Sequence, residues 1–207
     1  CKRDYGSLQK FALTRGIQMT TLGKLERAKN SEKDSYFSIV IQTLNEEPRI
    51  RRLLRSLQLQ SFKNFETIIV DGGSSDNTVS IAKRLLAKVQ VQKGCKEFPS
   101  RNLGARLADG DFLLFLSADV VLSSDSLENL AKEFGKDAEV SGLCGTGMPF
   151  DAPLWMKMEY LAFWKLLRVW MLLSKDSHGS TNFMAVRKND FHEIGGFLDE
   201  FCADTLF

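Results

Sequence analysis

Residues 37–48 read FSIVIQTLNEEP and combine a strand, a loop and a helix start in one stretch. The β-branched and aromatic run Phe37–Ile41 predicts a buried strand. The polar residues Gln42–Glu46 then form a loop, and Pro48 lies in the first turn of a helix, where proline is tolerated. The apolar stripe of that helix consists of Ile50, Leu53, Leu54 and Leu57. This order of elements is typical of an α/β sheet.

The same alternation of strand and helix continues along the chain. Further strands are predicted at Glu66–Val70, Val89–Gln92, Phe112–Leu116 and Val140–Cys144, and helices at about Asn77–Ala87, Pro99–Ala108 and Ser126–Phe134. The pattern predicts an α/β fold with a mostly parallel central sheet and helices on both faces. Such sheets bind ligands at the carboxyl ends of their strands. The loops of interest are therefore Gln42–Glu46, Asp71–Asp76 and Ser117–Val121.

Charge divides the 207 residues into two parts. Residues 1–36 hold 8 basic and 4 acidic side chains and read as a basic N-terminal extension and linker. Residues 37–207 hold 20 basic and 22 acidic side chains and read as one domain. The overall charge of +2 argues against a nucleic-acid partner, which requires a clear basic excess. The chain shows no secretory signal, so a cytoplasmic location is expected.

Five segments, in order, resemble motifs of family 2 glycosyltransferases with the GT-A fold. They are Ser38–Glu46, Ile68–Thr78, Ser100–Gly104, Gly110–Asp119 and the acceptor-side pair Gly179–Lys188 and Ile194–Glu200. The resemblance implies a GT-A domain over 37–207, with a nucleotide-binding half at about 37–122 and an acceptor-side half at about 123–207. Members of the family continue with further helices, so we expect the acceptor-side half to be truncated at its C-terminus.

The resemblance implies an inverting transfer of a sugar from a nucleotide-diphosphate donor of the UDP or GDP type. Thr43 and Asn45 offer hydrogen bonds to a base or ribose, and Glu46 accepts from hydroxyl or base N–H groups. By resemblance, Asp71 binds the nucleotide base. Arg101 either faces the diphosphate or is a surface cation of its helix.

For three further motif residues, a structural role is expected rather than a direct hydrogen bond to the donor. For Asp76, capping of the next helix outweighs ligand contact. Asn102 and Gly104 fit close packing over the nucleotide.

The turn Ser117-Ala118-Asp119 departs from the family pattern of two aspartates around one residue. A hydroxyl replaces the first carboxylate, which leaves Asp119 as the expected ligand of Mg²⁺ or Mn²⁺ and Ser117 as a donor-side contact. Mg²⁺ prefers hard oxygen ligands and keeps several waters, so one carboxylate and the donor phosphates suffice to hold it. We expect weaker metal binding than with a full pair of carboxylates.

The acceptor side also departs from the family pattern, because Cys202-Ala203-Asp204 stands where an acidic pair is usual. Asp204 is the candidate general base for an acceptor hydroxyl, and the alternative is a solvated carboxylate. His178 and Asn182 lie in the acceptor-side segment, although a lone histidine in a polar loop is more often structural.

The segment Trp155–Leu173 is rich in tryptophan, methionine and leucine, and its cations Lys157, Lys165 and Arg168 share one helical face. This profile indicates a helix that lies in a membrane interface. We therefore expect the chain at the cytoplasmic face of a membrane, and the expected acceptor is a sugar or a polyprenyl lipid. A core helix, a helix that pairs with a partner, and a membrane span remain alternatives. For the whole chain, the alternatives are a non-catalytic nucleotide-sugar binding module and a peripheral membrane protein.

Overall fold

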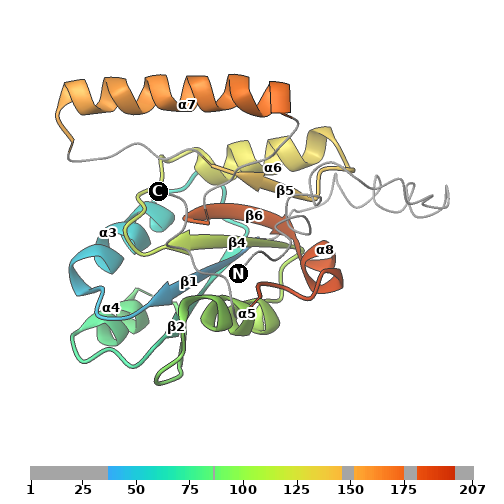
Figure 1. Cartoon of the computed structure of the whole chain (residues 1–207). Helices are drawn as coiled ribbons and strands as arrows, with labels where there is room; N and C mark the ends of the chain where they lie inside the picture. The colour runs from blue at the N-terminus through green and yellow to red at the C-terminus, as the bar shows by residue number, and fades with distance from the viewer. Residues whose placement is uncertain (1–36, 86, 146–151, 175–180, 199–207) are drawn as a thin grey trace, which may run out of the picture.

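The sheet is centred on β1 (Phe37–Thr43), whose residues are almost all buried. A computed structural model describes residues 37–85, 87–145, 152–174 and 181–198. In this part of the chain the strand order is β3-β2-β1-β4-β6-β5 (Figure 1). The strands β2 (Phe65–Asp71), β3 (Lys88–Val91) and β4 (Phe112–Ser117) pair in parallel with their neighbours around β1. The mostly parallel sheet is therefore confirmed.

Two antiparallel strands complete the sheet. β6 (Phe183–Arg187) pairs with β4, with Leu113 opposite Val186, and β5 (Gly142–Cys144) pairs with β6. Sequence reasoning did not predict β6 as a strand, and it predicted a β5 that began two residues earlier. The segment 183–187 is short, and its pairing partners are distant in sequence, so local periodicity carries little signal for it.

Helices cover both faces of the sheet, as predicted (Figure 1). The helices α3 (Glu47–Gln58), α4 (Thr78–Arg84) and α6 (Ser126–Lys136) contribute to one apolar cluster. The helices α5 (Glu97–Leu107) and α8 (Lys188–Glu193) contribute to the cluster on the other face. The predicted stripe of α3 is buried: Ile50, Leu53, Leu54 and Leu57. Burial of these two apolar faces is what holds the sheet between its helices.

The helix α7 (Leu154–Ser174) lies outside these layers, on the side of α6 (Figure 1). Its first half exposes large apolar side chains, namely Leu154, Trp155, Met156, Met158, Leu161, Phe163 and Leu166. The alternative of a buried core helix is therefore wrong for this part of α7. Within the described ranges, no helix is both long and apolar enough to cross a bilayer.

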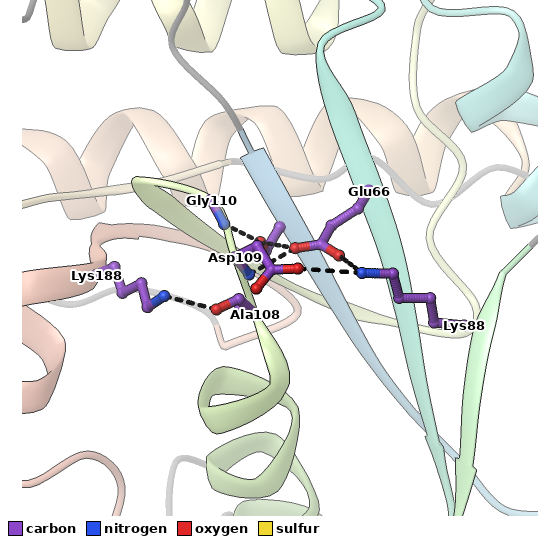
Figure 2. A network of polar contacts seen from close by, with 7 residues as sticks. Glu66, Lys88, Ala108, Asp109, Gly110 and Lys188 are labelled. Carbon is purple, nitrogen blue, oxygen red and sulfur yellow. Dashed lines mark hydrogen bonds and ion pairs between the residues drawn. The ribbon is translucent and has the colours of Figure 1, made fainter.

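A polar network closes the amino-terminal edge of the sheet (Figure 2). The buried carboxylate of Glu66 accepts hydrogen bonds from Ser38 Oγ at 2.5 Å, Lys88 Nζ at 2.6 Å and the Asp109 N–H at 2.7 Å. The Gly110 N–H in turn donates to Ser38 Oγ at 2.9 Å. These bonds join the turn before β4 to β1, β2 and β3.

Ionisation of Glu66 links this network to pH. Burial raises the pKa of Glu66, but the hydrogen bonds from Lys88, Ser38 and Asp109 outweigh burial, so the pKa is lowered overall. An acid whose pKa is lower in the folded state stabilises the fold above its unfolded-state pKa, about 4.3 for Glu, and this stability is lost as the pH falls through the folded-state pKa.

Candidate functional site

Three polar loops meet at the carboxyl-terminal edge of the sheet. Strand register places Thr43 opposite Asp71 and Gln42 opposite Ser117. The loops after β1, β2 and β4 are therefore neighbours, as the alternation of strand and helix predicted. Their side chains can act together on one ligand.

Asp71 organises the loop that follows β2. Its side chain is fully buried, and Oδ2 accepts from Thr43 Oγ1 at 2.8 Å and Ser74 Oγ at 2.6 Å. Its Oδ1 accepts from the backbone N–H groups of Gly73 and Ser74 at 2.9 and 2.7 Å. In this structure the side chains of Asp71 and of the buried Thr43 both form hydrogen bonds within the chain. Their contact with a donor stays a prediction.

Asn45 joins the first two loops from the other side. It has a φ of 55°, a left-handed conformation that asparagine tolerates. Its N–H donates to Ser74 Oγ at 2.8 Å, and its Oδ1 accepts from the Ser75 N–H at 2.9 Å. Asn45 therefore fixes the relative position of the loops, and its predicted contact with a base or ribose is untested.

Asp76 caps a helix, as predicted. Its Oδ1 accepts from the Thr78 N–H at 3.0 Å at the start of α4, and its Oδ2 accepts from the Glu47 N–H at 3.0 Å at the start of α3. Burial raises the pKa of Asp76. These hydrogen bonds and that from Thr78 Oγ1 lower it and outweigh burial, so the overall pKa is lowered. One carboxylate thus orients two helices.

A cavity of about 210 Å³ opens where these loops meet. It is lined by Gln42, Glu46, Arg49, Glu97, Ser117, Ala118, Asp119 and Asn182. The structure thereby brings together four predicted site residues, Glu46, Ser117, Asp119 and Asn182. Sequence reasoning placed Ser117 on the donor side and Asn182 on the acceptor side. The two are in contact, with Ser117 Oγ donating to Asn182 Oδ1 at 2.9 Å.

Sequence reasoning missed two charged residues of this cavity, Arg49 and Glu97. Arg49 Nη1 pairs with Glu46 Oε2 at 2.9 Å, one helical turn away, and this hydrogen bond raises the pKa of Arg49. Glu97 pairs with Arg101 at the helical spacing of four residues. That spacing was the available signal for Glu97. The three acids and one arginine give the cavity a mixed, net acidic lining.

Arg101 is neither a surface cation nor a lining residue of this cavity. Its side chain is only 1% exposed, and Nη2 pairs with Glu97 Oε1 at 2.8 Å. Burial lowers the pKa of Arg101, against the opposing charge of Glu97. The guanidinium therefore contacts the walls of the cavity from the buried side. The alternative that Arg101 is a surface cation of its helix is wrong.

Asn102 and Gly104 both make close contacts within the fold, and their expected packing over a nucleotide stays a prediction. Asn102 exchanges two hydrogen bonds with the backbone of Phe197, at 2.8 and 2.9 Å. A Cβ on Gly104 would lie 2.3 Å from Val40 Cγ1. These motif residues hold α5 against β1 and against the segment after α8.

The oxygen-rich turn fits a hard divalent cation only in part. Asp119 offers one exposed carboxylate and Ser117 one hydroxyl oxygen. In the part of the chain that the structure describes, no group of three or more acidic, histidine or cysteine side chains could hold a metal. The donors present fit an ion that takes its remaining ligands from phosphate and water.

Two predicted residues, His178 and the candidate base Asp204, lie outside the described residues, as does the basic extension 1–36. Their roles stay predictions.

Comparison with known proteins gives several partial relatives. The chain is 31% identical over 127 residues to the poly(ribitol-phosphate) beta-N-acetylglucosaminyltransferase TarS of Staphylococcus aureus, which covers 55% of this chain and 22% of TarS. It is 37% identical over 109 residues to a PGL/p-HBAD biosynthesis glycosyltransferase of Mycobacterium bovis, and this match covers 48% of this chain and 42% of that enzyme. A Campylobacter jejuni enzyme, GalNAc(5)-diNAcBac-PP-undecaprenol beta-1,3-glucosyltransferase, is 31% identical over 115 residues, covering 52% and 37%. The matched region thus spans less than half the length of each relative.

Solved structures share the fold. The mannosyltransferase PcManGT from Pyrobaculum calidifontis aligns with a TM-score of 0.64 at 21% identity, covering 88% of this chain and 56% of that one. Glucosyl-3-phosphoglycerate synthase from Mycobacterium tuberculosis aligns with a TM-score of 0.56 at 18% identity, covering 85% and 64%. These alignments confirm the GT-A fold. The sequence model of glycosyl transferase family 2 matches residues 38–195, which include every strand except the first residue of β1, and every lining residue of the cavity. The chain therefore belongs to glycosyltransferase family 2.

Proposed function

We propose that the chain is an inverting glycosyltransferase that moves a sugar from a nucleotide-diphosphate donor to a lipid-linked acceptor. The observation that carries this proposal is the cavity at the carboxyl ends of β1 and β4, where Glu46, Ser117 and Asp119 meet Asn182. Carboxylates of this kind accept hydrogen bonds from sugar and ribose hydroxyls. Arg49 adds a charge that suits a phosphate oxygen.

The proposed reaction is a single displacement. The acceptor oxygen forms a bond to the anomeric carbon from the face opposite the nucleotide, and the bond from that carbon to the diphosphate oxygen breaks. The electron pair leaves with the diphosphate, and Asp204 takes the proton of an acceptor hydroxyl. With a lipid phosphate as acceptor, the attacking oxygen is already an anion, and Asp204 only orients it. One displacement inverts the anomeric configuration.

A divalent cation is proposed as cofactor, either Mg²⁺ or Mn²⁺. PcManGT is described in complex with GDP-Man and Mn²⁺, and the mycobacterial synthase with Mn²⁺ and UDP, which supports a UDP or GDP donor here. Asp119 would hold the ion, with Ser117 beside it. When bound, such an ion neutralises charge that develops on the leaving diphosphate.

The lipid-linked acceptor is proposed from α7 and one relative. The Campylobacter relative carries undecaprenol in its name. The exposed apolar side chains of α7 include Trp155 and Phe163, and Lys157 and Lys165 are on the same helix. Aromatic and apolar side chains with flanking cations are typical of a helix in a membrane interface. We place α7 at the cytoplasmic face of a membrane, where it would bring the cavity to a lipid-linked acceptor.

Transfer assays with UDP- and GDP-sugars, with and without Mn²⁺, test the activity. Asp119→Asn should reduce transfer about 100-fold, because it removes the only carboxylate of the turn. Asp111→Asn is the matched control and should leave transfer unchanged, because Asp111 lies just before β4, at the opposite end of that strand from Asp119. Calorimetric donor binding with no transfer to any lipid or sugar acceptor would contradict the proposal and favour a binding module.

Flotation with anionic vesicles tests the membrane role separately. Replacing Trp155, Met158 and Leu166 with glutamine should abolish flotation, because it removes apolar area that would enter the interface. Leu59→Gln is the control, since Leu59 is at least as exposed as the three replaced residues, at 72%, and lies at the end of α3. Flotation of the triple variant at the wild-type level would exclude α7 as the contact.

A further inference from the structure

The guanidinium of Arg101 is buried at the point where three walls of the cavity meet. Its Nη2 pairs with Glu97 Oε1 at 2.8 Å on α5 and lies 3.4 Å from Ser117 Oγ at the end of β4. Its Nη1 donates to the carbonyl of Thr181 at 2.6 Å, in the segment that leads into β6. Glu97 and Ser117 line the cavity, and Thr181 precedes the lining residue Asn182.

These contacts use the planar shape of arginine. A guanidinium presents several N–H groups in a fixed fork, whereas lysine presents one compact charge on a flexible stem. One arginine can therefore hold a carboxylate, a hydroxyl and a carbonyl from three separate elements at once. A lysine at position 101 would keep the charge opposite Glu97 but not this geometry.

The energetics of burial indicate a geometric role for Arg101. Burying a cation costs solvation energy, and a buried ion pair is often no more stabilising than apolar residues of similar volume. The charge is offset here by Glu97 and by the ring of Phe197, whose centroid lies 5.9 Å from Arg101 Cζ. Among the described residues, Arg101 Nε has no hydrogen-bond partner, so these contacts do not fully offset the solvation energy that burial costs. The gain is a fixed arrangement of the cavity walls.

The same contacts orient the hydroxyl of Ser117. Ser117 Oγ accepts from Arg101 and donates its only proton to Asn182 Oδ1. A hydroxyl has two acceptor lone pairs, so one remains for the cavity that Ser117 lines. Ser117, which stands where the family carries a carboxylate, is thereby held as an acceptor toward the ligand.

We propose that Arg101 is a positioning residue for sugar transfer, which fixes Glu97, Ser117 and the Thr181–Asn182 segment relative to one another and does not contact the diphosphate. This inference rests on the proposed function, and it adds the residue that aligns the donor-side and acceptor-side walls of the cavity. It replaces the expectation that Arg101 faces the diphosphate directly.

Steady-state kinetics of Arg101→Lys separate the two roles. Misalignment should lower kcat about 10- to 100-fold, while the donor KM and the affinity for UDP or GDP change less than about twofold. Arg106→Lys, the same substitution at an exposed position of the same helix, is the control and should leave kcat unchanged. Ser117→Ala should lower kcat as well, and the two losses should not be additive, because both changes break one network.

Amide hydrogen exchange adds a measurement that does not need activity. The Ser117 N–H donates to the Asn182 carbonyl at 3.1 Å, and Arg101→Lys should speed its exchange about tenfold, by loosening that segment. A large loss of UDP or GDP affinity with unchanged kcat would overturn the proposal, as would unchanged exchange at Ser117 or additive losses. If Arg101→Lys fails to fold, Glu97→Gln and Ser117→Ala must each reproduce the kcat loss. A wild-type chain without transfer would refute the proposed function, and the exchange result would still judge this inference.

Discussion

The contact between Gly104 of α5 and Val40 of β1 allows a quantitative test of the fold. A Cβ built on Gly104 would lie 2.3 Å from Val40 Cγ1 and 3.3 Å from Cγ2. Carbon atoms in good contact are about 3.5–4.0 Å apart, so Gly104→Ala creates an overlap of more than about 1 Å. Val40 is fully buried and β-branched, so its methyl groups have little freedom to move away.

Two opposing effects set the magnitude for Gly104→Ala. Overpacking of this kind costs about 1–3 kcal/mol of unfolding free energy. Alanine in place of glycine within a helix returns up to about 1 kcal/mol. We therefore expect Gly104→Ala to destabilise the chain by about 1–2 kcal/mol.

A double-mutant cycle isolates the contact. Val40→Ala removes two buried methyl groups and should cost about 2 kcal/mol. In the double variant the new Cβ at position 104 occupies space that Val40 has vacated. The double variant should then be about 1–2 kcal/mol more stable than the sum of the single changes predicts. Urea unfolding followed by circular dichroism measures all four proteins.

Gly135→Ala is the matched control. Gly135 is also helical, in α6, and a Cβ there would meet nothing within 4 Å. This variant should be stabilised by about 0.5–1 kcal/mol, because only the helix preference acts. The reasoning is refuted if Gly104→Ala is as stable as Gly135→Ala, or if the cycle with Val40→Ala is additive.

Three further variants test contacts distant from the cavity or at its margin. Glu66→Gln should cost about 1–2 kcal/mol at pH 7, and the difference from wild type should shrink as the pH falls below about 4, in urea unfolding at several pH values. Asn102→Ala should lower the melting temperature through a loss of about 1–3 kcal/mol, because both backbone groups of Phe197 lose their partner. Asp76→Ala should cost about 1 kcal/mol in urea unfolding at pH 7, through the lost cap at Thr78; wild-type stability for this variant would show that the cap contributes nothing.

Strands and caps could be predicted because their signals are local. The run Phe37–Ile41 is apolar and β-branched over consecutive positions, and Phe112–Leu116 is apolar throughout, so each predicts a buried strand by itself. Asp76 lies next to the helix that it caps. The carboxyl-end rule for parallel sheets then placed Glu46, Ser117 and Asp119 at one edge. The cavity confirms this grouping.

The sequence alone thus determined the α/β alternation, the family and the edge of the sheet that carries the cavity, because these depend on periodicity and on short motifs. The tertiary structure alone decided that Arg101 is buried, that Asn102 pairs with Phe197, and that β6 inserts beside β4. Each of these depends on contacts between residues that are distant in the chain. The physical reason is that a side chain's environment is set by the elements packed against it, and a local pattern carries no record of which distant element that will be.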